Sequence, residues 1–149
     1  MKKLSERCSI WSKVFEMIYG TGIDLVSIRR IEKVIRKWGN RFVKRVFTAE
    51  ETRICYNRPS SYSAFALRFG AKEAFSKALG LGMRKGIRWR DIEVFNNPAG
   101  KPGLRLYGAA SETCKEKGIN GIHLSLSDDG EYGIAMVVLE ILRDGGKTC

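Results

Sequence analysis

Two carboxylates and one lysine are the side chains of this sequence best placed to do chemistry. Asp24 lies near the end of the apolar residues 18–25, and Glu73 stands within residues 68–77, a mostly apolar helical pattern. A hard divalent cation such as Mg²⁺ prefers oxygen ligands and usually takes one or two carboxylates together with substrate phosphates. Lys77 follows Glu73 by four residues, so the two share one helix face. A cation and a metal carboxylate on one buried face predict a site for a diphosphate.

Two of the candidate side chains also have an ordinary structural interpretation. Glu73 and Lys77 have the spacing of a common stabilising pair on a helix surface. His123 is the only histidine, and a single histidine is more often structural than catalytic. It shares the polar face of a predicted strand with Ser125 and Ser127, which favours a functional role without establishing one.

The charge of the chain points to an anionic substrate or partner. A length of 149 residues suits one domain, and 44% hydrophobic with 29% charged residues is a globular composition. The formal net charge is +11, which does not say which anion is bound. Between positions 29 and 53, three acidic residues accompany nine basic ones: Arg29, Arg30, Lys33, Arg36, Lys37, Arg41, Lys44, Arg45 and Arg53. This segment is either a solvated helix face or a docking surface for an acidic protein or nucleic acid.

The cysteines and the apolar runs exclude several classes of protein. Cys8, Cys55, Cys114 and Cys149 are scattered, without a CxxC pair or a nearby histidine, so a zinc site is not expected. Residues 1–15 lack the continuous apolar centre of a signal peptide, which predicts free thiols in a reducing cytosol. No apolar run approaches the ~20 residues of a membrane span.

Capping signals and hydrophobic periodicity predict helices in the first half of the chain and mainly strands in the second. Ser27 and Gly39 are the expected caps of one helix, and Thr48 with Glu51 forms the capping box of another. The predicted helices are residues 28–38, a short segment after Thr48 that ends before Pro59, 61–79, and 109–117. The predicted strands are 18–25, interrupted by two glycines, then 91–95, 104–107, 122–127 and 132–141.

Several short motifs occur in order from about residue 18 to residue 140. They are residues 22–25 with Ile28 and 30–32, residues 41–42 with 45–48, residues 68–69 with 71–74 and 76–78, and residues 88–94, 100–102 and 123–127. Each motif alone is weak, but the ordered set is specific. The sequence resembles the holo-acyl-carrier-protein synthase family, the small phosphopantetheinyl transferases.

The resemblance implies a fold and a reaction. The fold would be α+β, with one long buried helix packed on a small antiparallel sheet, assembled as a homotrimer with active sites at subunit interfaces. The reaction would transfer the 4′-phosphopantetheine arm of coenzyme A to a serine of an apo acyl carrier protein in fatty acid biosynthesis, releasing adenosine 3′,5′-bisphosphate. The attacking hydroxyl belongs to the partner, in keeping with a sequence that has no GxSxG elbow.

The resemblance also implies roles for named residues. Asp24 and Glu73 would hold Mg²⁺, which also binds the coenzyme A diphosphate, while Lys77 and Arg68 would contact phosphate. Three residues match a loop near the adenine and the 3′-phosphate: Gly100, Lys101 and Pro102. The serine proton could pass to Glu73, to water on the metal, or to His123, which could serve a neighbouring subunit. The docking surface for the acidic carrier would include Arg30, Arg41 and Arg45, a complementarity that mainly raises the encounter rate.

Two points of variation within the family bear on this chain. Relatives carry either His or Asp after the last motif, and here Asp128 and Asp129 follow Ser127, which argues against a role for a second histidine and adds a carboxylate that could affect metal or phosphate binding. Relatives also begin just before the first strand, so residues 1–16 are interpreted as a non-essential extension of a single domain over residues 17–149.

Three alternatives remain open at this stage. The same chemistry could serve polyketide or peptide-synthetase carrier domains, although relatives with that range are usually longer tandem duplications. A basic nucleic-acid-binding module would explain the charge but not the placement of Asp24 and Glu73, and the sequence has no RNP motif or zinc finger. A catalytically dead relative is disfavoured because Asp24, Glu73 and Lys77 are all present.

Overall fold

Along the sequence, the first element is a strand and the last two are strands, and all the helices lie between them. The computed structural model describes residues 15–84 and 86–143. Within them the elements are β1 (Phe15–Ser27), α1 (Ile28–Trp38), α2 (Asn40–Val46), α3 (Ala49–Tyr56), α4 (Ser61–Leu79), the 3₁₀ helix η1 (Trp89–Asp91), β2 (Ile92–Asn96), β3 (Pro102–Leu106), α5 (Gly108–Glu116), β4 (Gly121–Asp128) and β5 (Tyr132–Arg143).

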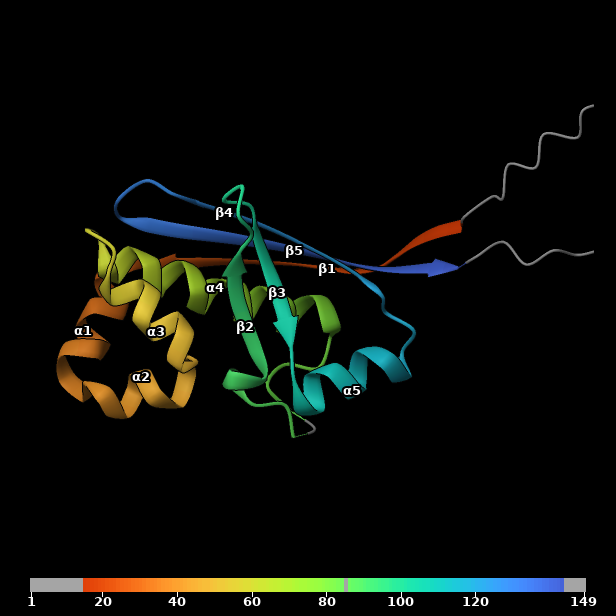
Figure 1. Ribbon diagram of the computed structural model, residues 1–149, viewed down its shortest axis with the longest axis horizontal. Coiled ribbons are helices and arrows are strands. Elements are labelled where there is room, and N and C mark those ends of the chain that lie inside the picture. Colours follow the sequence, from red (N-terminus) through yellow and green to blue (C-terminus); the bar gives the residue numbers. More distant parts are fainter. Residues whose placement is uncertain (1–14, 85, 144–149) are drawn as a thin grey trace, which may run out of the picture.

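The long helix α4 packs along a three-stranded antiparallel sheet of order β1-β5-β4 (Figure 1). A separate antiparallel hairpin pairs β2 with β3. Helices α1, α2 and α3 gather at one end of α4, and α5 lies at the other end (Figure 1). The predicted α+β fold, with a long and largely buried helix on a small antiparallel sheet, is confirmed.

Glycines on β1 let α4 approach the sheet closely. A Cβ at Gly22 would overlap the carbonyl oxygen of Ala74, and one at Gly20 would overlap that of Ala78. Both glycines therefore face α4, and Asp24 follows them on the same face because side chains alternate along a strand. The predicted interruption at these glycines is wrong: β1 is continuous, with only a register shift between Ile18 and Gly20.

Local capping chemistry sets the ends of the first helices as predicted. The Ser27 side chain accepts a hydrogen bond from the Arg30 backbone N–H at 3.3 Å, and α1 ends at Gly39. Gly39 has φ = 51°, a conformation that glycine adopts readily, and α2 begins at the next residue. Helix α2 was not predicted from the sequence, and its buried side chains are Val43 and Val46.

A fully buried ion pair ties α2, α3 and η1 to α4. The Lys72 ammonium donates to the Glu51 carboxylate at 2.7 Å, the Val46 carbonyl at 2.8 Å and the Trp89 carbonyl at 3.1 Å. Burial lowers the pKa of Lys72, and the charge of Glu51 opposes that shift. The second oxygen of Glu51 accepts the Val94 N–H at 2.9 Å, so the group also fixes β2. We refer below to Lys72 with these partners as the Lys72 hub.

Candidate active site

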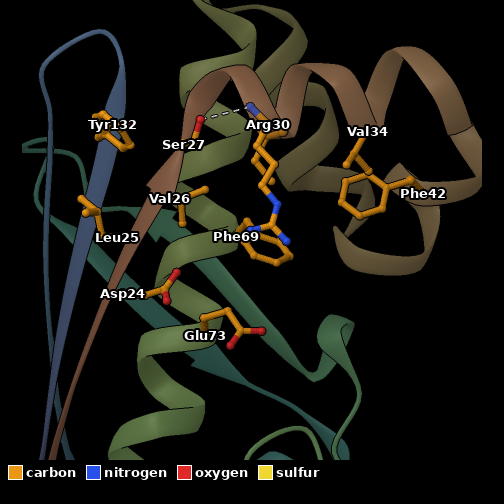
Figure 2. Close-up of a pocket in the computed structure, with 11 residues that line it drawn as sticks. Asp24, Leu25, Val26, Ser27, Arg30, Val34, Phe42, Phe69, Glu73 and Tyr132 are labelled. Atoms are coloured by element: carbon orange, nitrogen blue, oxygen red, sulfur yellow. Dashed lines mark hydrogen bonds between the residues drawn. The ribbon is translucent and has the colours of Figure 1, made fainter.

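Asp24 from β1 and Glu73 from α4 line one pocket. Figure 2 shows their carboxylates facing the same space, with Arg30 reaching down from α1 toward Phe69. The pocket has a volume of about 490 Å³. The structure thus brings together the two carboxylates that the sequence analysis proposed as metal ligands, and it adds Arg30 at the rim.

Lys77 contacts Asp24 rather than Glu73. Its ammonium lies 2.7 Å from the Asp24 carboxylate and donates to the Ile23 carbonyl at 2.9 Å. The Lys77 side chain is 51% exposed, so the prediction of a buried face carrying both Glu73 and Lys77 is wrong in this respect. Helical spacing alone could not reveal this partner, because Asp24 comes from a strand 53 positions earlier.

The two carboxylates carry more negative charge than their surroundings balance. Burial raises the pKa of Glu73, the charge of Asp24 raises it further, and Lys77 opposes both. Glu73 has no hydrogen bond or salt bridge to another described residue. Two neighbouring carboxylates repel each other. A divalent cation bound between them would offset that repulsion, so the pair fits a metal site.

The two carboxylates suit Mg²⁺ better than an ion whose ligands must all come from protein side chains. Among the described residues, no group of three or more His, Cys, Asp or Glu side chains is arranged to hold a metal. Mg²⁺ commonly takes one or two carboxylates and completes its coordination with water and substrate phosphate. The site therefore fits a metal that arrives with, or is completed by, a phosphorylated substrate.

A second pocket of about 490 Å³ contains three of the residues proposed to bind phosphate and adenine. It is lined by Arg68, Gly100 and Pro102, whereas Lys101 is exposed and is not part of the lining. Arg68 is 5% exposed; one terminal nitrogen donates to the Ala64 carbonyl, and its Nε and Nη2 have no partner among the described residues. Unpaired buried guanidinium donors are costly, and a bound anion would satisfy them.

Asp128 also lines this second pocket, next to α4. Its carboxylate accepts a hydrogen bond of 2.7 Å from the Ser63 hydroxyl. Asp128 was predicted only as an extra carboxylate that could affect metal or phosphate binding, and its partner Ser63 was not predicted. No local pattern connects two residues that are 65 positions apart.

His123 lies on the sheet face that points away from α4. The predicted alternation is confirmed: Ile122, Leu124 and Leu126 pack inward, and His123 is exposed with the neighbouring serines. The His123 ring contacts the Glu140 carboxylate at 2.7 Å. Within one chain the structure therefore does not bring His123 to Asp24 and Glu73, which lie on the α4 side.

Part of the outer face of the sheet, across β1 and β5, is apolar and exposed. The register aligns Ile23 with Met136 and Leu25 with Ile134 across β1 and β5, so these four side chains share one face. Their exposed fractions are 55%, 47%, 65% and 37% in that order. A contiguous apolar patch of this kind on a sheet marks a contact surface for another molecule.

The three arginines proposed for docking lie on α1 and α2. Arg30 lines the Asp24–Glu73 pocket, and Arg41 with Arg45 lines an adjoining groove whose apolar walls are Val34, Trp38 and Phe42. All three arginines are exposed. We call these residues the three-arginine surface. It places positive charge around an apolar groove beside the carboxylate pocket.

Comparisons with known proteins agree on one family. The family model described as the 4′-phosphopantetheinyl transferase superfamily matches residues 20–137. A holo-[acyl-carrier-protein] synthase of Geobacter metallireducens is 48% identical over 124 residues, covering 83% of this chain and 98% of the relative. One of Syntrophus aciditrophicus is 47% identical over 128 residues, covering 86% and 100%.

Solved structures of the same kind match the fold. The Neisseria meningitidis holo-[acyl-carrier-protein] synthase aligns with a TM-score of 0.78 and 38% identity, covering 83% of this chain and 98% of that one. The Helicobacter pylori synthase, solved in complex with coenzyme A, aligns with a TM-score of 0.71 and 34% identity, covering 80% and 98%. Among the described residues, no helix has the length and apolarity needed to cross a membrane.

Proposed function

This chain belongs to the 4′-phosphopantetheinyl transferase superfamily, and we propose that it converts apo acyl carrier protein into the holo form. The carrier's serine oxygen would attack the β-phosphorus of coenzyme A. The phosphorus–oxygen bond to adenosine 3′,5′-bisphosphate would break as the serine loses its proton. The observation that carries the proposal is the pairing of Asp24 and Glu73 in one pocket of a chain with these relatives.

We propose that Asp24 and Glu73 hold Mg²⁺, which would supply positive charge to the diphosphate. Lys77 pairs with Asp24 and orients its carboxylate, and the exposed ammonium remains within reach of a phosphate at the pocket. The burial of Glu73 makes a charged ligand more favourable there than in water. The proposed acceptors of the serine proton are Glu73, water at the site and His123 of a neighbouring subunit.

The second pocket is proposed to bind the nucleotide end of coenzyme A. Support comes from the two unpaired donors of buried Arg68, which suit the 3′-phosphate, and from Gly100 and Pro102 across the pocket. Lys101 lies between those two residues and would contact phosphate only from the exposed side of the loop.

The three-arginine surface is proposed as the docking site for the acidic carrier protein. Its position beside Asp24 and Glu73 would bring the carrier's serine to the diphosphate. Complementary charge of this kind speeds encounter and selects partners, so turnover should fall as salt increases. Fatty acid biosynthesis is the proposed pathway, and the cytosolic location predicted from the thiols stays a prediction.

A homotrimer with active sites between subunits is also proposed. Its support is the exposed apolar sheet face, which also carries His123 and would place this residue near a neighbour's site. A mixture of Glu73→Gln and His123→Ala chains tests the idea, because a shared site would restore activity in mixed trimers. A monomer by light scattering, or a mixture as inactive as its parts, would contradict it.

Mass spectrometry of the carrier tests the transfer itself. Apo acyl carrier protein is incubated with the chain, coenzyme A and Mg²⁺, and the intact mass is recorded with and without EDTA. A gain of one phosphopantetheine that EDTA abolishes is the expected result. If several fatty acid carriers stay unmodified while a peptide-synthetase carrier domain is modified, the chemistry stands and the carrier assignment is wrong.

A further inference from the structure

A basic groove next to the three-arginine surface has no role in the transfer as proposed. Its volume is about 720 Å³. One wall comes from α2 and the other from the segment leading into β2. The basic and aromatic side chains along it are Lys44, Arg45, Arg88, Trp89, Arg90 and Tyr107.

The positive charge of the groove is not neutralised by the described part of the chain. Lys44, Arg45, Arg88 and Arg90 are all exposed and form no salt bridge with a described carboxylate. Asp91 is the single acidic lining residue, so four cations face one carboxylate, which accepts a hydrogen bond from the Arg88 backbone N–H at 2.9 Å. Four clustered cations repel one another, so an anionic surface that enters the groove is attracted.

The walls of the groove are held rigidly from beneath. The ammonium of the Lys72 hub binds the carbonyl of Val46, directly after Arg45, and the carbonyl of Trp89, between Arg88 and Arg90. On the rim, the hydroxyls of Tyr107 and Thr48 donate to buried Glu93 at 3.2 and 2.9 Å. The groove is therefore preorganised, which lowers the entropic cost of binding.

The groove is continuous with the site proposed for the carrier protein. Arg45 lines both this groove and the apolar groove of the three-arginine surface. The Trp89 ring stacks on Phe69, which lines the Asp24–Glu73 pocket, with a centroid distance of 5.0 Å and an interplanar angle of 21°. An acidic protein docked with its serine at the carboxylates would thus extend over the groove.

The chemistry of the groove favours a protein over a small phosphate. A phosphate site typically has buried donors such as those of Arg68, whereas the cations here are exposed and share the rim with Tyr107, which is 46% exposed. Arginine and exposed aromatic rings are the residues enriched in protein interfaces. A specific interface also covers about 800 Å² on each partner, more than a few arginines on two helices would be expected to supply.

We infer that this groove is a second docking surface for the carrier protein and binds an acidic segment distant from the modified serine. The inference rests on the proposed function, because the same partner must occupy the carboxylate pocket. Contact along two adjoining basic surfaces fixes the orientation of the carrier as well as its affinity.

The test compares charge reversals inside and outside the groove. Arg88→Glu and Arg90→Glu are made separately, with Lys115→Glu on α5 as a control of equal charge change at an exposed site outside the groove. Binding of apo acyl carrier protein is measured by surface plasmon resonance without coenzyme A, and the KM values for carrier and coenzyme A are measured in the transfer assay. Arg90→Gln gives a milder version that removes the charge without reversing it.

The expected result is that each reversal weakens carrier binding and raises the carrier KM roughly fivefold or more. The KM for coenzyme A, the kcat at saturating carrier and the Lys115→Glu control should stay near the wild-type values. Equal effects in groove and control variants would overturn the inference. So would unchanged carrier binding with lost affinity for a single-stranded oligonucleotide, which would make the groove a nucleic-acid site.

The direct binding measurement separates this inference from the proposed function. If the wild type binds the carrier through the groove but transfers nothing, the proposed function fails and the docking surface stands. If transfer is normal in wild type and in every groove variant, the docking surface fails and the proposed function stands.

Discussion

Two lysines of helix α4 each pair with a carboxylate from another element. The two pairs have the same nitrogen–oxygen distance, but one is buried and the other is partly exposed. Lys72 with Glu51 and Lys77 with Asp24 both have a nitrogen–oxygen distance of 2.7 Å. The side chains of the first pair are 0% exposed, whereas those of the second are 51% and 15% exposed. Lys72 also has two backbone carbonyls as partners, and Glu51 accepts from Val94, so the first pair is fully satisfied.

Beside the second pair, the carboxylate of Glu73 has no positively charged partner of its own in the described part of the chain. Lys77 is shared between Asp24 and a backbone carbonyl, while Glu73 remains partly buried beside Asp24 with its pKa raised. A saturated buried pair fixes the fold, and an unbalanced, accessible group is suited to bind a ligand. Adjacent positions on one helix, Lys72 and Glu73, therefore serve stability and chemistry separately.

Removing the Lys72 ammonium should have the largest effect on stability. Lys72→Met leaves Glu51 buried without its partner, and breaking a buried pair in this way costs roughly 3–5 kcal/mol. Lys77→Met is the matched control and should change the free energy of unfolding by less than about 1 kcal/mol, because its pair is exposed. Urea unfolding measures both. Equal losses would show that burial does not distinguish the pairs.

Removing the Arg68 guanidinium should separate nucleotide binding from metal binding. Arg68→Met is expected to raise the KM for coenzyme A by roughly tenfold, because a charge-assisted contact to phosphate is lost. The KM for 3′-dephospho-coenzyme A should not change, and stability should not fall, because the orphan donors are removed with the side chain. Arg84→Met, at an exposed residue that lines neither this pocket nor the Asp24–Glu73 pocket, is the control. A uniform loss with both substrates would contradict the assignment.

The pKa of Glu73 should respond oppositely to its two neighbours. Lys77→Met should raise this pKa and Asp24→Asn should lower it, as followed by carboxyl NMR. Because the pKa of Glu73 is higher in the folded state, its contribution to stability is fully present at pH values below its ordinary pKa of 4.5. That contribution is lost as the pH rises through the raised pKa. Lack of response to either variant would place Glu73 away from both charges.

Deleting residues 1–16 should have the smallest effect. Residues 1–14 lie outside the described part of the chain, while Phe15 and Glu16 pair only with the last residues of β5. The site residues all come later, so transfer by the shortened chain should match the full chain within error. A large loss of activity would give the proposed extension a function.

Local chemistry explains which elements could be predicted. The caps at Ser27, Thr48 and Gly39 act within a few residues, so the sequence locates α1 and α3, and periodicity locates α4. Helix α2 was missed because a short basic segment shows its helical character only through the packing of Val43 and Val46. Both strands of the β2–β3 hairpin start one to two residues away from the predicted positions.

The site was predictable in its residue types but not in its contacts. A carboxylate in an apolar strand and another in an apolar helix identified Asp24 and Glu73. The Lys77–Asp24 pair depends on how closely β1 packs on α4 at Gly22, which no local pattern specifies. In the sequence, Lys72 and Glu73 look alike, because each is a charged residue in an apolar helix. Only the complete burial of Lys72 in the structure shows that its role is structural.

The central claim is that Glu73 is required for chemistry and not for folding. The most direct measurement is the intact mass of apo acyl carrier protein after incubation with Glu73→Gln, coenzyme A and Mg²⁺, with wild type alongside. We predict full modification by the wild type and none by a variant whose urea midpoint is at least as high. Near-normal modification by Glu73→Gln would remove Glu73 from the mechanism and contradict the assignment of the metal site.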